Sequence, residues 1–441
     1  MEKTTQEEKE IIAKALKVNI DDVTYDRSSN FKPEKNKFII KDKVINKFDI
    51  HCLKDYELSF LKCQIKTKIS IRKYIEDIKI KSLLFNDCSI NSIVFIDDFS
   101  CDNMHFLNCS IDKISCSKIS IKGDVKFKKC SFVKEFLLDN CKFLNAIYFN
   151  NSFFKSYADF HECEFDDIAC FYGVTFEKTP NFSQAIFEGN LNMVNTNLNF
   201  TFDDLQERIK QEYKDFNKTK EDQDKKPLDK FANDFRDSFR NFKSALIKDN
   251  NFLDASNFHK YELYCKEIEL KNKKATTFKD IVDRYQLLFY RKLCDHHTDL
   301  LLNLRWLVVV VGFFVSVLFI LRYGDGNLLQ FFNKDNDLLK ILKAMLNIKA
   351  LNDSNVTYLI LLYSFIGLFF VRTFFIFYYL VIFILMLAMS PYNLFSVVNF
   401  VTKDQSSSSL ENIIMVAYTL IMILVLFSLQ KTARKNSIVP S

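Results

Sequence analysis

The sequence predicts a mixed fold: a β-solenoid, a helical linker and a C-terminal bundle of transmembrane helices. Three observations lead to this prediction. Large apolar residues recur at steps of five and six in the first half, charged amphipathic segments follow, and long uncharged stretches occupy the last third. We expect four regions: an N-terminal helix and cap (1–49), the solenoid (50–202), a charged helical linker with a helical hairpin (203–304) and a transmembrane domain (305–441).

The N-terminal region is expected to begin with a short helix. Thr5-Gln-Glu-Glu8 has the spacing of a capping box, and the next two turns carry an apolar face formed by Ile11, Ile12, Ala15 and Leu16. Because the first coil of a solenoid needs an end cap, we interpret this helix as that cap. A helix that binds a partner is the alternative.

The solenoid prediction depends on a repeat that is clearest in residues 127–198. Written in blocks of eleven, this segment places a large apolar residue at alternating steps of five and six. Fainter copies begin at Phe60, Phe85 and Phe106. These steps fit neither a helix nor a strand, but they fit a chain that turns a corner every five or six residues. The predicted inward ladder consists of Phe127, Phe132, Leu138, Phe143, Phe149, Phe154, Phe160, Phe165, Phe171, Phe176, Phe182, Phe187, Met193 and Leu198.

The pattern Phe-x-x-[Cys/Ala/Ser/Thr]-x-Phe resembles that of the pentapeptide-repeat family. The resemblance implies a right-handed quadrilateral β-helix with one five-residue unit on each side. This sequence departs from the family by alternating five and six residues. Some members of the family are acidic rods that mimic DNA and bind a topoisomerase, but here the outer positions mix both signs and Lys126–Lys142 is basic. We therefore expect no nucleic-acid partner, and DNA mimicry is the least favoured function.

Six of the twelve cysteines occupy the small position of the repeat, where Ser152, Val174, Ala185 and Thr196 also occur. The interchange indicates that this position selects for size, so we interpret these cysteines as core residues and not as metal or redox sites. Met1 is not followed by an apolar leader, which favours a reducing compartment over a disulfide framework. The six residues are Cys63, Cys88, Cys109, Cys130, Cys141 and Cys163.

The linker begins with charged residues 203–226 and continues as two amphipathic segments around a turn at Asp249-Asn-Asn251. The segments Phe239–Leu246 and Asp254–Glu262 resemble the linker of bacterial membrane proteins that join pentapeptide repeats to transmembrane helices. Glu262 is a candidate functional acid, although a salt bridge within the hairpin is the favoured interpretation. Farther on, Cys294-Asp-His-His-Thr-Asp299 is dense in metal-ligand types. Because adjacent residues splay around a helix, we expect a polar helix end or a pH-responsive His pair and no metal site.

The transmembrane domain is predicted to contain four spans. The first lies between Arg305 and Arg322, and a longer apolar stretch is divided by Arg372. An even number of spans keeps the soluble half and the basic tail on one side, as the positive-inside rule requires. With three spans, Arg372 would be buried in the membrane and become a functional candidate. The predicted spans are residues 306–322, 356–371, 373–389 and 413–429.

No nucleotide-binding, hydrolase or metalloprotease motif occurs, so the sequence predicts a non-enzymatic protein without cofactors or catalytic residues. We expect a multi-pass protein of the bacterial inner membrane whose solenoid faces the cytoplasm. Its predicted partners are the lipid bilayer and a cytosolic protein of unknown identity, for which the solenoid is an interaction or scaffolding surface. The alternative is a channel-like or pore-forming effector gated by the solenoid and linker. The sequence leaves open whether the protein forms a homo-oligomer.

Overall fold

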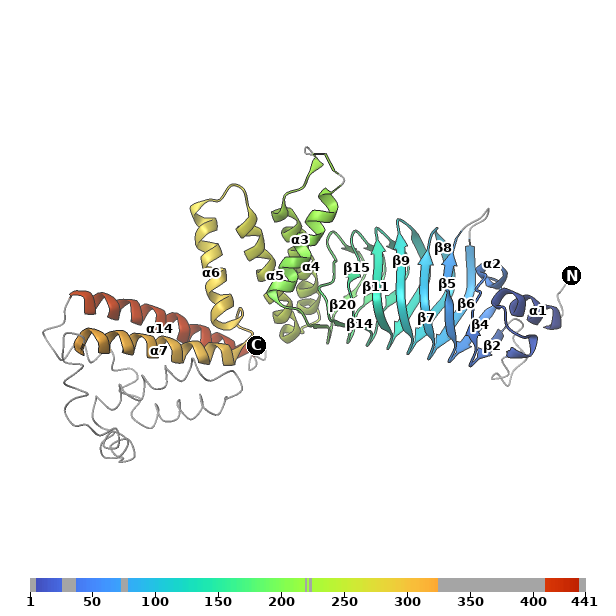
Figure 1. Cartoon of the computed structure of the whole chain (residues 1–441), viewed down its shortest axis with the longest axis horizontal. Coiled ribbons are helices and arrows are strands. Elements are labelled where there is room, and N and C mark those ends of the chain that lie inside the picture. The colour runs from blue at the N-terminus through green and yellow to red at the C-terminus, as the bar shows by residue number, and fades with distance from the viewer. Residues whose placement is uncertain are drawn as a thin grey trace, which may run out of the picture. The chain divides into compact units, whose positions relative to one another are not determined.

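The computed structural model describes residues 5–25, 37–72, 78–218, 220–221, 224–323 and 409–435. The chain divides into two compact units, Met1–Tyr285 and Gln286–Ser441, and each is described by itself. The first contains the β-solenoid and the helices that follow it, and the second contains two long helices (Figure 1).

A small cap precedes the coils. Helix α1 (Thr5–Leu16) buries Ile12, Ala15 and Leu16 in the apolar core that continues into the solenoid. The 3-10 helix η1 (Ile20–Asp22) and strand β1 (Val23–Tyr25) follow, and β1 pairs antiparallel with β2 (Lys37–Lys41). All later pairs of strands are parallel, beginning with β2 and β4. Parallel pairing therefore starts at Lys37, ahead of residue 50, where the repeat pattern in the sequence places the solenoid boundary.

The solenoid has about seven turns and two parallel sheets (Figure 1). In its N-terminal half the strands are mostly five to nine residues long, with α2 (Ile50–Leu53) between two of them. One sheet continues through β4 (Glu57–Leu61), β6 (Ile78–Asn86), β8 (Phe99–Leu107) and β10 (Ser120–Lys128). The other contains β3 (Val44–Ile45), β5 (Gln64–Ile71), β7 (Ser89–Phe95), β9 (Ser110–Ser117) and β11 (Ser131–Asp139).

The C-terminal half contains two-residue strands separated by turns. Lys142 lies beside Glu164 at a separation of 22 residues, so one coil contains two of the eleven-residue blocks. The earlier segments are rich in Ile, Val and Ser, whereas the later ones contain Asp166-Asp167, Pro180 and Gly189, which favour turns. The strands are β12 (Lys142–Phe143), β13 (Ile147–Tyr148), β14 (Phe153–Phe154), β15 (Ala158–Asp159), β16 (Glu164–Phe165), β17 (Ala169–Cys170), β18 (Thr175–Phe176), β19 (Ile186–Phe187), β20 (Leu191–Asn192) and β21 (Asn197–Leu198).

The core consists of stacked aromatic rings. Phe106, Phe127 and Phe149 stack at centroid distances of 4.8 and 5.3 Å, close to the spacing of neighbouring strands. Of the fourteen ladder residues named from the sequence, all are buried except Phe187 and Leu198, which are partly buried in the last coil. The rings of the central ladder therefore stack on their equivalents in the coils before and after them, as Phe149 does on Phe127 and Phe171.

Among the described residues of the first unit, four α-helices follow the solenoid, the last of which crosses into the second unit. They are α3 (Phe202–Asn217), α4 (Leu228–Lys248), α5 (Phe252–Asn272) and α6 (Phe278–Cys294). Helices α4 and α5 form a hairpin that covers the last coil. The Phe242 ring meets the edge of Phe182 at 4.8 Å, and the Tyr261 hydroxyl donates to the Leu198 carbonyl at 2.8 Å. Both ends of the solenoid are thus covered by elements of the same chain.

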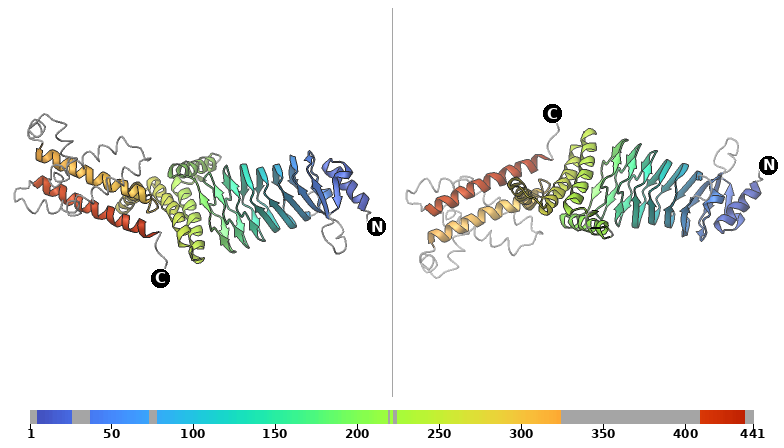
Figure 2. Two further views of the ribbon diagram at one scale, coloured as in Figure 1. Left: turned by 90° about the horizontal axis from the view of Figure 1, so that it is seen from below. Right: turned by 90° about the horizontal axis from the view of Figure 1, so that it is seen from above.

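The second unit contains α7 (Leu300–Tyr323) and α14 (Ser409–Lys435), which lie side by side (Figure 2). Within the described residues, one segment, Val416–Arg434, is long and apolar enough to cross a membrane, judged by length and composition; Leu300–Val310 is a shorter apolar segment. The predicted spans 306–322 and 413–429 fall within these helices. The predicted spans 356–371 and 373–389, with Arg372, lie outside the described residues. The four-span arrangement therefore stays a prediction.

Candidate functional site

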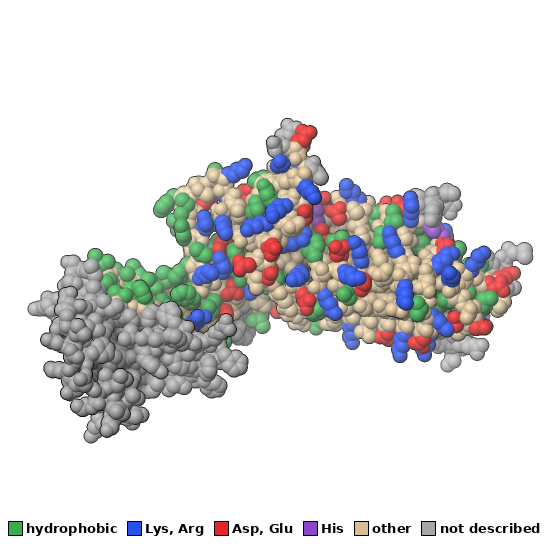
Figure 3. All heavy atoms as spheres, in the orientation of Figure 1, with side chains coloured by type: hydrophobic (Ala, Val, Ile, Leu, Met, Phe, Trp, Pro, Cys, Tyr) green, Lys and Arg blue, Asp and Glu red, His purple; other side chains and the backbone are tan. Residues whose placement is uncertain are grey.

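The solenoid surface is the largest candidate site, and its charges are mixed. Lys113 pairs with Glu135 and Lys134 with Asp112, both at 2.7 Å and both between neighbouring coils. Basic and acidic side chains are interspersed over this part of the molecule (Figure 3). Many charged groups therefore hold one coil to the next, and the surface lacks the uniform sign of a nucleic-acid or DNA-mimic surface on the face shown.

One sheet face carries apolar and aromatic side chains in register. We call this surface the outer face, defined by Leu84, His105, Leu107, Lys126 and Tyr148 on β6, β8, β10 and β13. Strand pairing aligns Leu84 with His105, His105 with Lys126 and Lys126 with Tyr148. Leu84 and Leu107 are 37% and 40% exposed, and the Lys126 ammonium lies 5.3 Å from the centroid of the Tyr148 ring. Two exposed leucines, a histidine, a lysine and a tyrosine therefore share one face of this sheet.

The corners of the coils depend on residues in left-handed conformations. The residue before each small position of the repeat has a positive φ, as in Lys62 (52°), Asn108 (52°) and Lys129 (56°). Asn, Asp and Gly tolerate this conformation, and Gly173 occupies the equivalent position of a later coil. Sequence reasoning missed this feature, although the Asn, Asp and Gly residues before several of the small positions indicate it.

The small position also has a hydrogen-bonding role. The Cys109 thiol donates to the Phe85 carbonyl at 3.5 Å, and the Ser152 hydroxyl donates to the Phe127 carbonyl at 3.2 Å, in each case across to the preceding coil. Hydrogen bonds between stacked thiols, together with burial, raise the pKa of Cys88 to about 11 and that of Cys109 to about 12. At the end of this row, a hydrogen bond from Cys109 lowers the pKa of Cys130. In these coils the residue at the small position is therefore both small and a hydrogen-bond donor.

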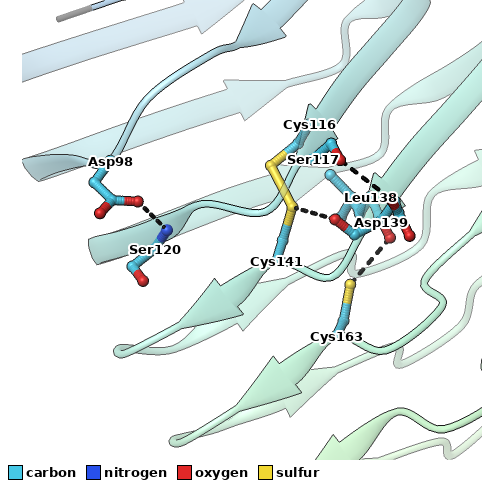
Figure 4. Close-up of a disulfide and its surroundings, with 8 residues drawn as sticks. All are labelled: Asp98, Cys116, Ser117, Ser120, Leu138, Asp139, Cys141 and Cys163. Atoms are coloured by element: carbon cyan, nitrogen blue, oxygen red, sulfur yellow. Dashed lines mark hydrogen bonds between the residues drawn. A yellow bond between two sulfur atoms is a disulfide. The ribbon is translucent and has the colours of Figure 1, made fainter.

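A disulfide joins Cys116 to Cys141 in the next coil (Figure 4), whereas the sequence suggested reduced thiols throughout. The other ten cysteines are free. Cys116 pairs with Leu138 in the register of the large ladder positions, where its smaller side chain leaves room for a neighbouring sulfur. Cys141 occupies a small position. No spacing in the sequence brings these two positions together, which is why sequence reasoning did not find the pair.

A partly buried polar cluster attaches α3 to the solenoid. The Arg208 guanidinium lies 3.4 Å from the centroid of the Tyr157 ring, and the Tyr157 hydroxyl donates to Glu212 at 2.6 Å. Arg208 also pairs with Glu212. Burial, followed by the charge of Glu212, raises the pKa of Asp159 to about 6. These groups resemble an acid–base constellation, but Glu212 of α3 is bound by both Tyr157 and Arg208, so the arrangement acts as a helix-docking contact.

Glu262 forms the centre of the hairpin ion cluster. It accepts hydrogen bonds from Arg240 at 3.1 Å, from Lys243 at 2.5 Å and from His259 at 3.1 Å. Burial alone would raise the pKa of Glu262, but these three partners outweigh it and lower the pKa to about 2. Glu262 thus joins α4 to α5, as the salt-bridge interpretation expects, and stays ionised.

In the second unit, the segment Cys294–Asp299 forms the connection between α6 and α7. His297 lies with Nδ1 3.5 Å from the Cys294 sulfur and 3.3 Å from the Ser428 hydroxyl on α14. Asn303 of α7 donates to the same hydroxyl at 2.9 Å. The cluster therefore connects three helices. Among the described residues, no three His, Cys, Asp or Glu side chains are placed to hold a metal ion.

These features define a β-solenoid protein with both ends covered and with apolar helices at its C-terminal end. Comparisons with protein-family models, with curated proteins and with solved structures found no match to this chain.

Proposed function

We propose that the protein is a non-enzymatic scaffold of a bacterial inner membrane, with its solenoid in the cytoplasm and its outer face as the binding surface for a protein. The observation that carries the proposal is the outer face, where exposed Leu84 and Leu107 lie in neighbouring rows of a rigid sheet beside Tyr148.

Membrane attachment is supported by the second unit. Helix α14 exposes large apolar side chains, including Ile413 (70%), Val416 (62%) and Phe427 (66%), and α7 exposes Phe313 (51%). Exposure of such apolar surfaces to water is unfavourable, whereas their contact with lipid chains is favourable. The multi-pass topology, with spans 356–371 and 373–389 and Arg372 between them, forms part of the proposal.

We also propose that the solenoid is a right-handed quadrilateral β-helix of the pentapeptide-repeat class. Its later coils support this proposal, because each of the coils that begin at Lys142 and Glu164 places its strands at intervals of five or six residues. The row of Cys, Ser and Thr at the small positions agrees with the same class.

The test of the scaffold function uses the full chain in native membranes with a photo-crosslinking residue at Leu107. We expect a discrete crosslinked partner that is lost when Leu84→Asp is added. It should be kept when Val44→Asp, at an exposed apolar position on the other sheet, is added as the matched control. Loss in both variants, or in neither, would contradict a role for the outer face. Conductance of the purified chain in planar bilayers would instead favour the pore-forming alternative.

Attachment is tested separately by alkaline extraction of membranes. We expect the full chain to stay with the lipid pellet, and a chain ending at Asp299 to be released. Release of the full chain would overturn the membrane location.

A further inference from the structure

Helix α6 carries an exposed apolar stripe. Five large side chains follow one another at helical spacing along twelve residues, so they share one face. Exposed fractions of this size are usual for charged side chains and unusual for several large apolar side chains on one face. The stripe consists of Phe278 (81%), Ile281 (43%), Val282 (48%), Tyr285 (63%) and Phe289 (36%).

The stripe belongs to a well-formed helix and not to a frayed segment. At its start, the Asp280 amide donates to the Thr277 hydroxyl at 3.2 Å, and the Thr277 amide donates to the Asp280 carboxylate at 2.9 Å. This reciprocal pair is a capping box. At its end, Leu293 and Cys294 are buried in the cluster that includes Leu307 and Val425. The helix is therefore fixed at both ends while its stripe stays exposed.

The opposite face of α6 carries most of its charged residues, and Leu287 and Tyr290 lie among them. Asp283 lies about half a turn from the stripe, and Arg284 and Arg291 lie on the same polar side. Lys292 continues the line of the stripe towards the C-terminal end of the helix, where a long side chain can carry its charge away from an apolar phase. An exposed apolar stripe with charged residues on the other side of the same helix is the pattern of a segment that lies at a membrane surface.

The position of α6 in the chain supports the same environment. Five residues separate the end of α6 from the start of α7, whose first turns expose Leu301 (55%) and Trp306 (37%). Within the second unit, the end of α6 runs across the direction of α7 and α14 (Figures 1 and 2). A helix that runs across membrane-spanning helices, at their end, lies parallel to the membrane plane.

We infer that α6 is an interfacial helix whose stripe inserts among the lipid headgroups and upper acyl chains of the bilayer. The inference rests on the proposed membrane attachment and adds a second contact with lipid to it. This contact would hold the linker along the membrane surface instead of leaving it suspended in water.

The test uses tryptophan fluorescence, because Trp306 is the only tryptophan in the chain. In the full chain carrying Trp306→Phe, Tyr285→Trp places the probe in the stripe. Asp283→Trp in the same background is the matched control on the polar face. Each protein is reconstituted into vesicles of phosphatidylethanolamine and phosphatidylglycerol with bromine placed high or low on the acyl chains. We expect a blue shift for the stripe probe and loss of its emission, strongest with the shallow bromines, and quenching of the control by aqueous iodide.

Three outcomes would overturn the inference. A stripe probe that is quenched by iodide and not by bromine, while native Trp306 is quenched by bromine, leaves the attachment intact and removes the interfacial helix. A blue-shifted stripe probe that bromine does not quench indicates that protein covers the stripe. If bromine quenches neither the stripe probe nor Trp306, the proposed attachment itself is wrong. Phe289→Trp provides a second stripe position should Tyr285→Trp disturb the fold.

Discussion

At the scale of the residue, the solenoid is stabilised by side-chain size, hydrogen-bond donors and backbone φ at positions that recur in the coils. A large ring must reach the centre of each coil, a small side chain must lie where coils meet, and its neighbour must adopt a left-handed conformation. Each requirement recurs at the spacing of one coil. Because the same contact is made many times, a single substitution disturbs both adjacent coils as well as its own.

The central ring of a coil is expected to be essential. Phe149 is fully buried and stacks on Phe127 and Phe171, so Phe149→Ala leaves a cavity in the aromatic column. We expect a loss of about 3–5 kcal/mol in the free energy of unfolding, measured by denaturant titration in detergent. Tyr172→Ala, which changes an exposed neighbour, should cost less than about 1 kcal/mol. Equal losses in the free energy of unfolding for the two variants would show that the aromatic column contributes no more to stability than the exposed residues do.

The left-handed corner gives a prediction of the opposite sign. Lys129 has a φ of 56° and its row contains Gly173. Lys129→Gly should stabilise the fold by up to about 1 kcal/mol, because glycine pays no steric cost there. Lys129→Val should destabilise it, since a β-branched side chain disfavours this conformation most. Thermal unfolding of both variants checks the order, which would be reversed if the corner were extended.

At the scale of the element, docking of α3 on the solenoid depends on polar groups far apart in the sequence. Asp159 has a pKa raised from 3.8 to about 6, so the folded state binds its proton more tightly than the unfolded state. This contribution to stability is complete below about pH 4 and is lost as the pH rises through 6. Asp159→Asn should remove this pH-dependent loss, roughly 2 kcal/mol between pH 4 and 7. The free energy of unfolding is measured for both proteins at several pH values. A difference between them that stays constant from pH 4 to 7 would contradict the prediction.

The α4–α5 hairpin should respond to pH in the reverse sense. The pKa of Glu262 is lowered to about 2, so its contribution is present above about pH 4.5 and is lost as the pH falls through 2. Glu262→Gln should cost roughly 2 kcal/mol at neutral pH and little in strong acid. Glu269→Gln, which changes the neighbouring ion pair to Arg236, is the comparison. It distinguishes an effect of the Glu262 cluster from a general loss of stability in acid.

The elements differ in how far the sequence predicts them. The solenoid and the helices after it can be predicted from local periodicity. Each step of five or six and each amphipathic stripe involves residues that are close together in the sequence. The disulfide of Cys116 and the stacking of Arg208 on Tyr157 depend on which coil or helix lies beside which, and no local pattern records that. The sequence did not predict the early coil because Ile40 and Lys43 occupy the positions that Phe60 and Cys63 occupy in the next coil.

At the scale of the whole molecule, the pairing of the cysteines gives a prediction. Ten free thiols and one disulfide predict that the denatured, unreduced chain takes up ten alkylating groups, and twelve after reduction. Mass spectrometry of the chain isolated with rapid acid quenching measures the number. Twelve groups without reduction would contradict the disulfide between Cys116 and Cys141.

In the later half of the solenoid neighbouring coils are offset by 22 residues, which determines how this part of the chain can change in length. Adding or deleting 22 residues would add or remove one layer of roughly 4.8 Å and leave every other row in register. Adding 11 residues would preserve the alternation of large and small positions, yet it would transfer the outer face of all later coils to the opposite sheet. Sequences derived from this one by duplication can therefore vary in reach in whole layers while keeping the same binding side.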